Sequence, residues 1–313
     1  PGINSYKEVR RVADQRIALP KRRWVDKHLF ILLLLPTLCV LVGITIYPLC
    51  YNIWLSFMEF NLTDPTTGAR WIGVANWAKT FTSNLTQKAF LNTFIFTASV
   101  VATEFILALA IAVLINRPFF GKKIIFTGLL LPIMIAPVAC GLTWKYMYNG
   151  EFGIIAYLLK SLGFQTFSLL SNSRTALLSV VIQDIWHWTP FLMLIFYSGL
   201  LSLPAEPYEA AMVDGSTKWQ VFRNITLPLM KSFFLIGVLL RTMDAFKIFD
   251  EIYMMTQGGP GKATEVVNFY VYRQCFRYFS IGDGAAMALV ILIVTIILSN
   301  FYIKVLKEKA EEE

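Results

Sequence analysis

The sequence is short of the residues from which catalytic and metal sites are usually built. Its 313 residues include only two histidines, His28 and His187, and four cysteines, no two of which have metal-ligand spacing. It contains neither a His-Glu-x-x-His helix nor a Gly-x-Ser-x-Gly elbow. We therefore expect a chain that is not an enzyme, with no catalytic residue and no metal site.

Charge is scarce as well. Charged residues make up 15% of the chain and hydrophobic residues 56%, whereas soluble domains are usually about 25% charged. The mean hydropathy of +0.58 is too high for one soluble core, and disorder is excluded. Because the net charge of +8 accompanies this apolar composition, it is tested first as a membrane-orientation signal and does not indicate nucleic acid.

Long apolar runs are what the sequence has in abundance. A bilayer core about 30 Å thick needs about 20 apolar residues in a helix. Six segments qualify, at about residues 28–58, 89–116, 124–144, 175–203, 232–256 and 284–303. The runs are continuous and do not alternate, so helices are expected and barrel strands are not. The predicted fold class is an all-α membrane protein with six transmembrane helices.

The basic residues are unevenly distributed between the expected loops. Lys and Arg gather before residue 28, at 117–123, at 218–231 and after residue 303. The positive-inside rule then places both termini in the cytoplasm. The expected organisation is a basic cytoplasmic tail (1–27), a six-helix transmembrane domain in contact with the lipid bilayer (28–303) and a cytoplasmic tail (304–313).

The loop between the fourth and fifth spans, residues 204–228, has the pattern of two short helices. Pro204 and Pro207 suit a first helical turn, and Glu209 follows early, where it complements the positive helix end. Asp214-Gly215 is a turn signal. A second amphipathic stretch then follows. This loop is expected on the cytoplasmic side.

Several fixed residue types at fixed spacing identify this loop. It resembles the EAA coupling loop of ABC importer permeases in the following residues: Glu209, Ala210, Ala211, Asp214, Gly215, Phe222, Ile225, Leu227 and Pro228. Ser216 stands where Ala is more usual. The segment Thr256-Gln257-Gly258-Gly259-Pro260 is similar to a signature of carbohydrate-importer permeases. Tyr47-Pro48, Ser56-Phe57 and residues 71–77 resemble the larger permease of maltose-type importers.

The resemblance implies a non-catalytic subunit of an ATP-driven importer in the bacterial cytoplasmic (inner) membrane. Its implied partners are a second homologous permease, two ATPase subunits, and a periplasmic or lipid-anchored binding protein that delivers a carbohydrate. No cofactor is expected in this chain, because ATP and Mg²⁺ would be bound by the ATPase subunits. The nearest approach to a phosphate loop, at residues 258–262, is followed by Ala263 where Ser or Thr is required.

Ionisable residues inside spans predict a substrate path. At about 1.5 Å per residue, Asp184 and Arg241 both lie roughly 13 Å from the ends of their helices, near the midplane. The resemblance places sugar contacts on these two helices. The candidate path residues are Asp184, His187, Trp188, Phe191, Arg241, Asp244, Ala245 and Ile248.

Other interpretations of these residues stay open. Arg241 and Asp244 are i,i+3 neighbours that could neutralise one another, and His187 could be a packing residue. Asp184 could pair with the second permease, and Glu104 is expected to be structural. Asp250 and Glu251 are expected near the outer end, either solvated or facing the binding protein. An unpaired Arg241 would indicate an anionic sugar derivative.

Two alternative functions also remain open. One is an ABC permease for a non-carbohydrate solute, which the 256–260 signature disfavours. The other is a secondary transporter driven by an ion gradient through the charges of the fifth span, which the coupling loop disfavours.

Overall fold

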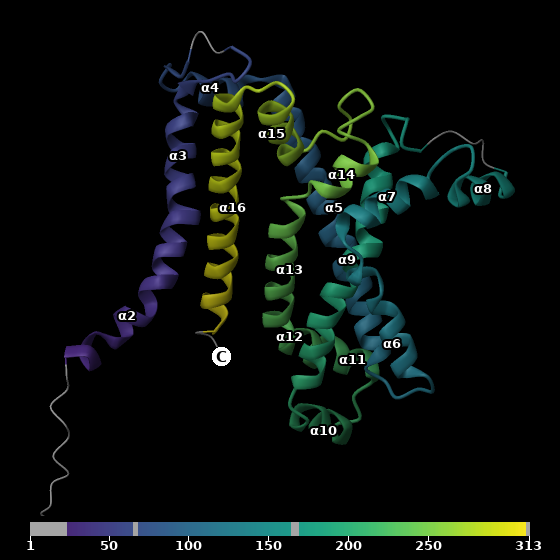
Figure 1. Ribbon diagram of the computed structural model, residues 1–313. Coiled ribbons are helices and arrows are strands. Elements are labelled where there is room, and N and C mark those ends of the chain that lie inside the picture. The colour runs from purple at the N-terminus through teal and green to yellow at the C-terminus, as the bar shows by residue number, and fades with distance from the viewer. Residues whose placement is uncertain (1–23, 65–67, 164–168, 311–313) are drawn as a thin grey trace, which may run out of the picture. The chain divides into compact units, whose positions relative to one another are not determined.

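The computed structural model describes the backbone of residues 24–64, 68–163 and 169–310, and the side chains of residues 33–305 within those ranges. Most of the expected N-terminal tail, residues 1–23, lies outside the described residues. Contacts divide the chain into two units, residues 1–54 and 55–313, and each is described by itself (Figure 1).

The first unit is helical throughout its described part. Helix α2 (Trp24–Leu41), a π-helical stretch (Val42–Ile46) and α3 (Tyr47–Ser56) follow one another without a break, and α3 ends in the second unit. Residues Leu33–Ser56 are long and apolar enough to cross a membrane. This agrees with the first expected span.

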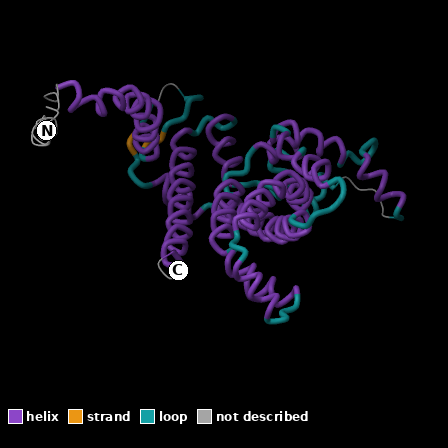
Figure 2. Tube along the Cα trace, turned by 90° about the horizontal axis from the view of Figure 1, so that it is seen from below, coloured by secondary structure: helices purple, strands orange, loops and turns teal. Residues whose placement is uncertain are grey.

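The second unit begins with a short β-hairpin that is hydrogen-bonded to the helix after it. Strands β1 (Met58–Glu59) and β2 (Arg70–Trp71) pair antiparallel and are drawn in orange in Figure 2, ahead of α4 (Ala75–Thr82). The Asn76 amide donates to the carbonyls of Ser56 and Met58 at 3.0 and 2.8 Å. These bonds fix the entry into α5, and they explain why polar residues occur at this point in an apolar chain.

Three further long apolar helices match the second, fourth and sixth expected spans. They are α5 (Asn84–Ile115), α9 (Ala176–Ser202) and α16 (Ile281–Ala310), each long enough to cross a bilayer. Counting the first span, four expected spans are thus present as helices among the described residues. The complete set of six stays a prediction.

Helix α5 is central to the core of the second unit. One buried cluster joins its Phe96 and Val100 to Val180 of α9. A second joins Ala108 and Ala112 to α9 further along, and a third joins Ala89 to α15 (Val267–Phe276) and α16. In the second cluster, the small side chains of Ala108 and Ala112 let α5 approach α9 closely.

The third expected span is interrupted. Helix α6 (Lys122–Leu130) is followed by a 3-10 turn (Pro132–Met134) and then by α7 (Pro137–Met147) and α8 (Ile154–Ser161). The two prolines lack the N–H that would continue a helix, and Ile135 has extended backbone. Residues 124–144 are therefore two shorter helices with a break near Ile135, and we expected one span.

The fifth expected span is also discontinuous. The residues Lys218–Leu229 and Lys231–Met255 could cross a membrane together, but they are bent by 61° between the two stretches. Within the second stretch, α13 (Lys231–Ala245) and α14 (Asp250–Met255) are separated by four residues outside α-helix. Two of the uninterrupted spans expected from hydropathy are thus broken helices.

Candidate functional site

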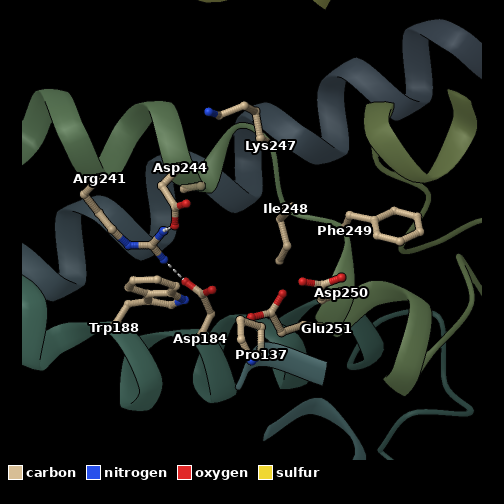
Figure 3. A pocket seen from close by; sticks show the side chains of 11 residues that line it. Pro137, Asp184, Trp188, Arg241, Asp244, Lys247, Ile248, Phe249, Asp250 and Glu251 are labelled. Carbon is tan, nitrogen blue, oxygen red and sulfur yellow. Dashed lines mark hydrogen bonds and ion pairs between the residues drawn. The ribbon is translucent and has the colours of Figure 1, made fainter. Parts of the chain in front are cut away.

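A small recess of about 100 Å³ lies where these two broken helices meet α9. Its walls come from the start of α7, from α9, and from the junction of α13 with α14 (Figure 3). The lining residues are Pro137, Asp184, Trp188, Arg241, Asp244, Ala245, Lys247, Ile248, Phe249, Asp250 and Glu251. Discontinuous helices at membrane depth are tolerated where they are buried in protein or line a cavity.

Arg241 is the centre of an ion-pair group, which we call the Arg241 cluster (Arg241, Glu104, Asp184 and Asp244). Three of its members are buried and Asp244 is exposed. The guanidinium holds Glu104 in a fork, from Nε to Oε2 at 2.6 Å and from Nη2 to Oε1 at 3.0 Å. Nη2 also donates to Asp184 Oδ2, and Nη1 donates to Asp244 Oδ2 at 3.0 Å. Arg241 and Glu104 are 1% and 0% exposed. A buried arginine paired in this way is held by its partners.

This geometry shows which side chains Arg241 pairs with within the chain. It does pair with Asp244, as one interpretation expected, but it also pairs with Asp184 and Glu104 from two other helices. The condition for an anionic substrate was an unpaired Arg241, and that condition is not met. Glu104 has the structural pairing expected for it, because it anchors α5 to α13.

His187 lies behind the recess and is not among the residues that line it. Its Nε2 donates to the Ile135 carbonyl at 2.9 Å. That carbonyl is available because the break between α6 and α7 leaves Ile135 outside a helix. The other ring nitrogen, Nδ1, lies 3.7 Å from Glu251 Oε1 and has no hydrogen-bond partner. His187 thus joins α9 to the broken third span.

Glu251 is placed differently from the expectation. It was expected near the outer end, either solvated or facing the binding protein, yet it is 5% exposed and lines the recess. The cause is the short helix α14, which packs on α7 at Gly141. A Cβ added to Gly141 would lie 3.3 Å from the Glu251 Cα atom. Hydropathy carries no signal for such a turn back into the protein.

The remaining path candidates divide into two groups. The Trp188 ring lies under Arg241, with 5.4 Å from the guanidinium carbon to the ring centroid, and Ala245 and Ile248 lie buried on the wall. Phe191 meets Trp188 edge-on at 6.2 Å but does not line the recess. Sequence reasoning missed Pro137, whose only signal was a proline inside an apolar run.

The segment of residues 204–228, here the short-helix segment, has the expected pair of helices. Helix α10 (Glu206–Val213) ends at a turn where Gly215 adopts a φ of +69°, which only glycine adopts readily. Thr217 and Gln220 form a capping box on α11 (Lys218–Val221). A π-helical stretch (Phe222–Thr226) and α12 (Leu227–Leu229) lead on to α13. The role of the short-helix segment in coupling to an ATPase stays a prediction.

The surface of this segment is unusually apolar. Met212, Val213 and Trp219 are 71%, 89% and 67% exposed, and Glu209, Ala210 and Asp214 are exposed beside them. Ala211 alone of the predicted coupling residues is buried, and the Tyr208 hydroxyl meets the Thr226 hydroxyl at 3.0 Å. Exposed apolar residues rimmed by polar ones are typical of an interaction surface.

The segment from Thr256 to Pro260 forms a tight turn. The Thr264 hydroxyl donates to Thr256 Oγ1 and lies 2.7 Å from the Gly259 carbonyl oxygen as well. Gly258 has a φ of +79°, and an added Cβ would meet Glu265 at 2.7 Å. Glu265 is buried at an ion-pair distance of 2.7 Å from Arg273. Burial raises the pKa of Glu265, and Arg273 opposes that rise.

Comparison with known proteins gives consistent results along the chain. The family model described as "Binding-protein-dependent transport system inner membrane component" matches residues 20–311. The trehalose/maltose transport system permease protein MalF of Thermococcus litoralis is 30% identical, over 91% of this chain and 96% of its own. The trehalose transport system permease protein SugA of Mycobacterium tuberculosis is 32% identical, over 90% of each.

The fold also has a counterpart among solved structures. A chain from the crystal structure of a bacterial ABC transporter involved in the import of the acidic polysaccharide alginate superposes with a TM-score of 0.79. The match covers 92% of this chain and 99% of the other, at 20% sequence identity. At that identity the likeness shows a common fold.

Proposed function

The chain belongs to the family of binding-protein-dependent transport system inner membrane components, and on that premise we propose that it is the permease subunit of an ABC importer for carbohydrate. The observation that carries the proposal is similarity over nearly the full length of the chain to sugar permeases. The family is one of transport components, so the chain is a multi-pass membrane protein whose task is to provide a path.

The path through this subunit runs by the recess at Asp184, Trp188 and Asp244. Three observations support this choice. The recess lies at the junction of broken helices, it has polar groups at its mouth, and one wall carries an aromatic ring. Transporter sites are found near the midplane at such helix breaks. Asp184 and Asp244 would accept hydrogen bonds from sugar hydroxyls, and Trp188 would support an apolar sugar face.

The short-helix segment is the contact with a separate ATPase subunit. Its exposed Met212, Val213 and Trp219 form an apolar patch beside Glu209 and Gly215. ATP-driven closure of two ATPase subunits would move this segment and its counterpart on a second, homologous permease. ATP and Mg²⁺ are then bound outside this chain. The segment would lie on the cytoplasmic side of the bacterial inner membrane, with both termini, and a binding protein would dock on the opposite side.

The test is ATPase activity of the whole complex, co-expressed with the genes that neighbour its own and reconstituted in lipid. Activity is measured with and without the binding protein, across a panel of sugars. We expect stimulation that requires both the binding protein and a sugar. A complex without a co-purifying ATPase, in which this chain alone performs gradient-driven uptake, would overturn the proposal. Stimulation by a non-carbohydrate solute alone would retain the importer and reject the sugar.

A further inference from the structure

The recess has more acidic than basic groups. Asp184, Asp244, Asp250 and Glu251 line it, against Arg241 and Lys247. Figure 3 shows the Lys247 amine pointing away from the other charged groups, whereas the four carboxyl groups lie around the recess. Counting Lys247, four carboxyl groups line the recess against two positive charges, so acid is in excess.

The one inward positive charge is already engaged. Arg241 has five N–H donors, and four of them are bonded to Glu104, Asp184 and Asp244. A carboxylate or sulfate arriving in the recess would find one N–H left on Nη1, beside three carboxyl groups already bonded to the guanidinium. To form the usual fork of two hydrogen bonds it would have to displace one of these carboxyl groups. Displacing Glu104 would leave a fully buried acid without its counter-ion, which is strongly unfavourable. Arg241 is thus a positioning residue for the acidic wall and not a ligand for an anion.

A second, independent observation concerns His187. Its Nε2 donates to the Ile135 carbonyl, so in the neutral ring Nδ1 is an acceptor. Nδ1 is buried, has no hydrogen-bond partner and faces Glu251 of the recess wall. The Glu251 carboxyl group, which lines the recess, lies 3.7 Å from Nδ1, beyond hydrogen-bond distance. A hydroxyl group that donates to Glu251 would complement this part of the wall.

We propose that the recess selects an uncharged, hydroxyl-rich sugar and excludes anionic sugars. This inference rests on the proposed function and names its substrate class. The sugar hydroxyls donate to Asp244 and Glu251, and an apolar sugar face lies on Trp188. The solved importer of similar fold carries an acidic polysaccharide, so the same fold would serve opposite charge classes through different residues in the path.

The first test separates the permease from its binding protein, because the binding protein also selects. The purified permease–ATPase complex, without binding protein, is titrated with maltose and with the matched disaccharide whose terminal sugar is oxidised to a uronic acid. Binding is followed by tryptophan fluorescence, and a complex carrying Trp188→Phe identifies the share of the signal that comes from the recess. We expect at least about tenfold weaker binding of the uronate, from repulsion by two nearby charges. Equal or tighter binding of the uronate overturns the inference.

The second test alters the charge of the wall. Asp244→Asn should reduce the preference for the neutral sugar about fivefold, which is the effect of one unit charge at 4 Å in water. The control is Glu151→Gln, which removes an exposed acid that is not among the residues lining the recess. It should leave the preference unchanged. An equal change in both variants would mean that overall charge, and not the recess, sets selectivity, which also contradicts the inference.

A transport assay then distinguishes failure of the charge selectivity from failure of the proposed importer function. Proteoliposomes that contain the complex, with ATP on the side of the ATPase subunits, receive the binding protein and a mixture of neutral and uronate disaccharides. Accumulation of the neutral sugar alone supports the inference. Accumulation of the uronate overturns it while leaving a working carbohydrate importer. Absence of ATP-dependent accumulation of any sugar, in a complex that hydrolyses ATP, would overturn the proposed function as well.

Discussion

The Arg241 cluster and the short-helix segment differ in how exposed their functional side chains are. In the cluster, Glu104 of α5, Asp184 of α9 and Arg241 of α13 are buried and paired with one another, and Asp244 is the exposed member. In the segment, Met212, Val213 and Trp219 are apolar and exposed. Burying an unpaired charge is costly, and leaving a large apolar patch in water is costly too. The cluster is therefore complete in this chain, whereas the segment is complete only against another surface.

The two regions should therefore affect different properties: the cluster the stability of the subunit, and the segment its coupling to the ATPase. A change in the cluster should lower the stability of the subunit itself. A change in the segment should leave the subunit folded and affect only events that involve a partner.

The largest effect is expected from Arg241→Met. It leaves Glu104 and Asp184 buried without their counter-ion, and breaking a buried pair in this way costs about 3–5 kcal/mol. Thermal unfolding of the detergent-purified complex measures the loss. The matched control is Lys247→Met, at an exposed lysine six residues further on, which should change stability by at most about 0.5 kcal/mol. If both variants lose the same stability, the cluster does not hold the helices together.

The next effect is expected in the segment, from Gly215→Pro. Gly215 has a φ of +69° and proline is confined to about −65°, so the substitution forces the turn into another conformation. The turn lies at the exposed surface, so the melting temperature of the spans should stay unchanged while ATP-driven uptake is lost. Ser216→Ala, which brings in the residue more usual there, is the control and should keep uptake. Normal uptake by an inserted Gly215→Pro protein would remove the coupling role.

How far the sequence predicts the structure differs between these two regions. The short-helix segment is local: Pro204, Pro207 and the turn signal at Asp214-Gly215 act on their own neighbours, so pattern alone predicts the two helices. The Arg241 cluster joins residues 104, 184 and 241–244 across three helices. Spacing predicted that Asp184 and Arg241 both lie near mid-depth, but it could not predict that they meet.

The broken spans are the other point at which sequence reasoning fell short. Hydropathy averages over a window, so it predicted one span at 124–144 and gave no weight to Pro132 and Pro137. The break at Ile135 and the turn back through α14 bring His187 and Glu251 together. These features depend on packing at Gly141 against α14. A single sequence contains the proline signal for the first break but nothing comparable for the contact.

A moderate effect is expected from Glu209→Lys, which reverses an exposed charge in α10. At the start of a helix an acidic side chain contributes about 0.3–1 kcal/mol, so stability should fall only slightly. Uptake should fall much further, because Glu209 lies beside the predicted contact with the ATPase. The measurement is sugar-stimulated ATPase activity. The matched control is Glu59→Lys, an exposed charge reversal far along the chain from the segment, which should keep that stimulation. A proportionate loss of stability and activity would make Glu209 a structural residue.

The smallest effect is expected from Tyr208→Phe, and it tests how rigid the segment must be. The Tyr208 hydroxyl lies 3.0 Å from the Thr226 hydroxyl, and this contact joins α10 to the π-helical stretch before α13. Its removal should cost about 1 kcal/mol, as for one half-buried neutral hydrogen bond. Tyr157→Phe, at an exposed tyrosine of α8, controls for loss of a hydroxyl alone. If α10 must move as one body with α13, uptake falls several-fold while ATP hydrolysis continues, so the two activities become uncoupled. If uptake and ATP hydrolysis fall together, or if neither changes, the Tyr208–Thr226 contact does not transmit force. The evidence that the short-helix segment acts on a partner would then come from the turn at Gly215.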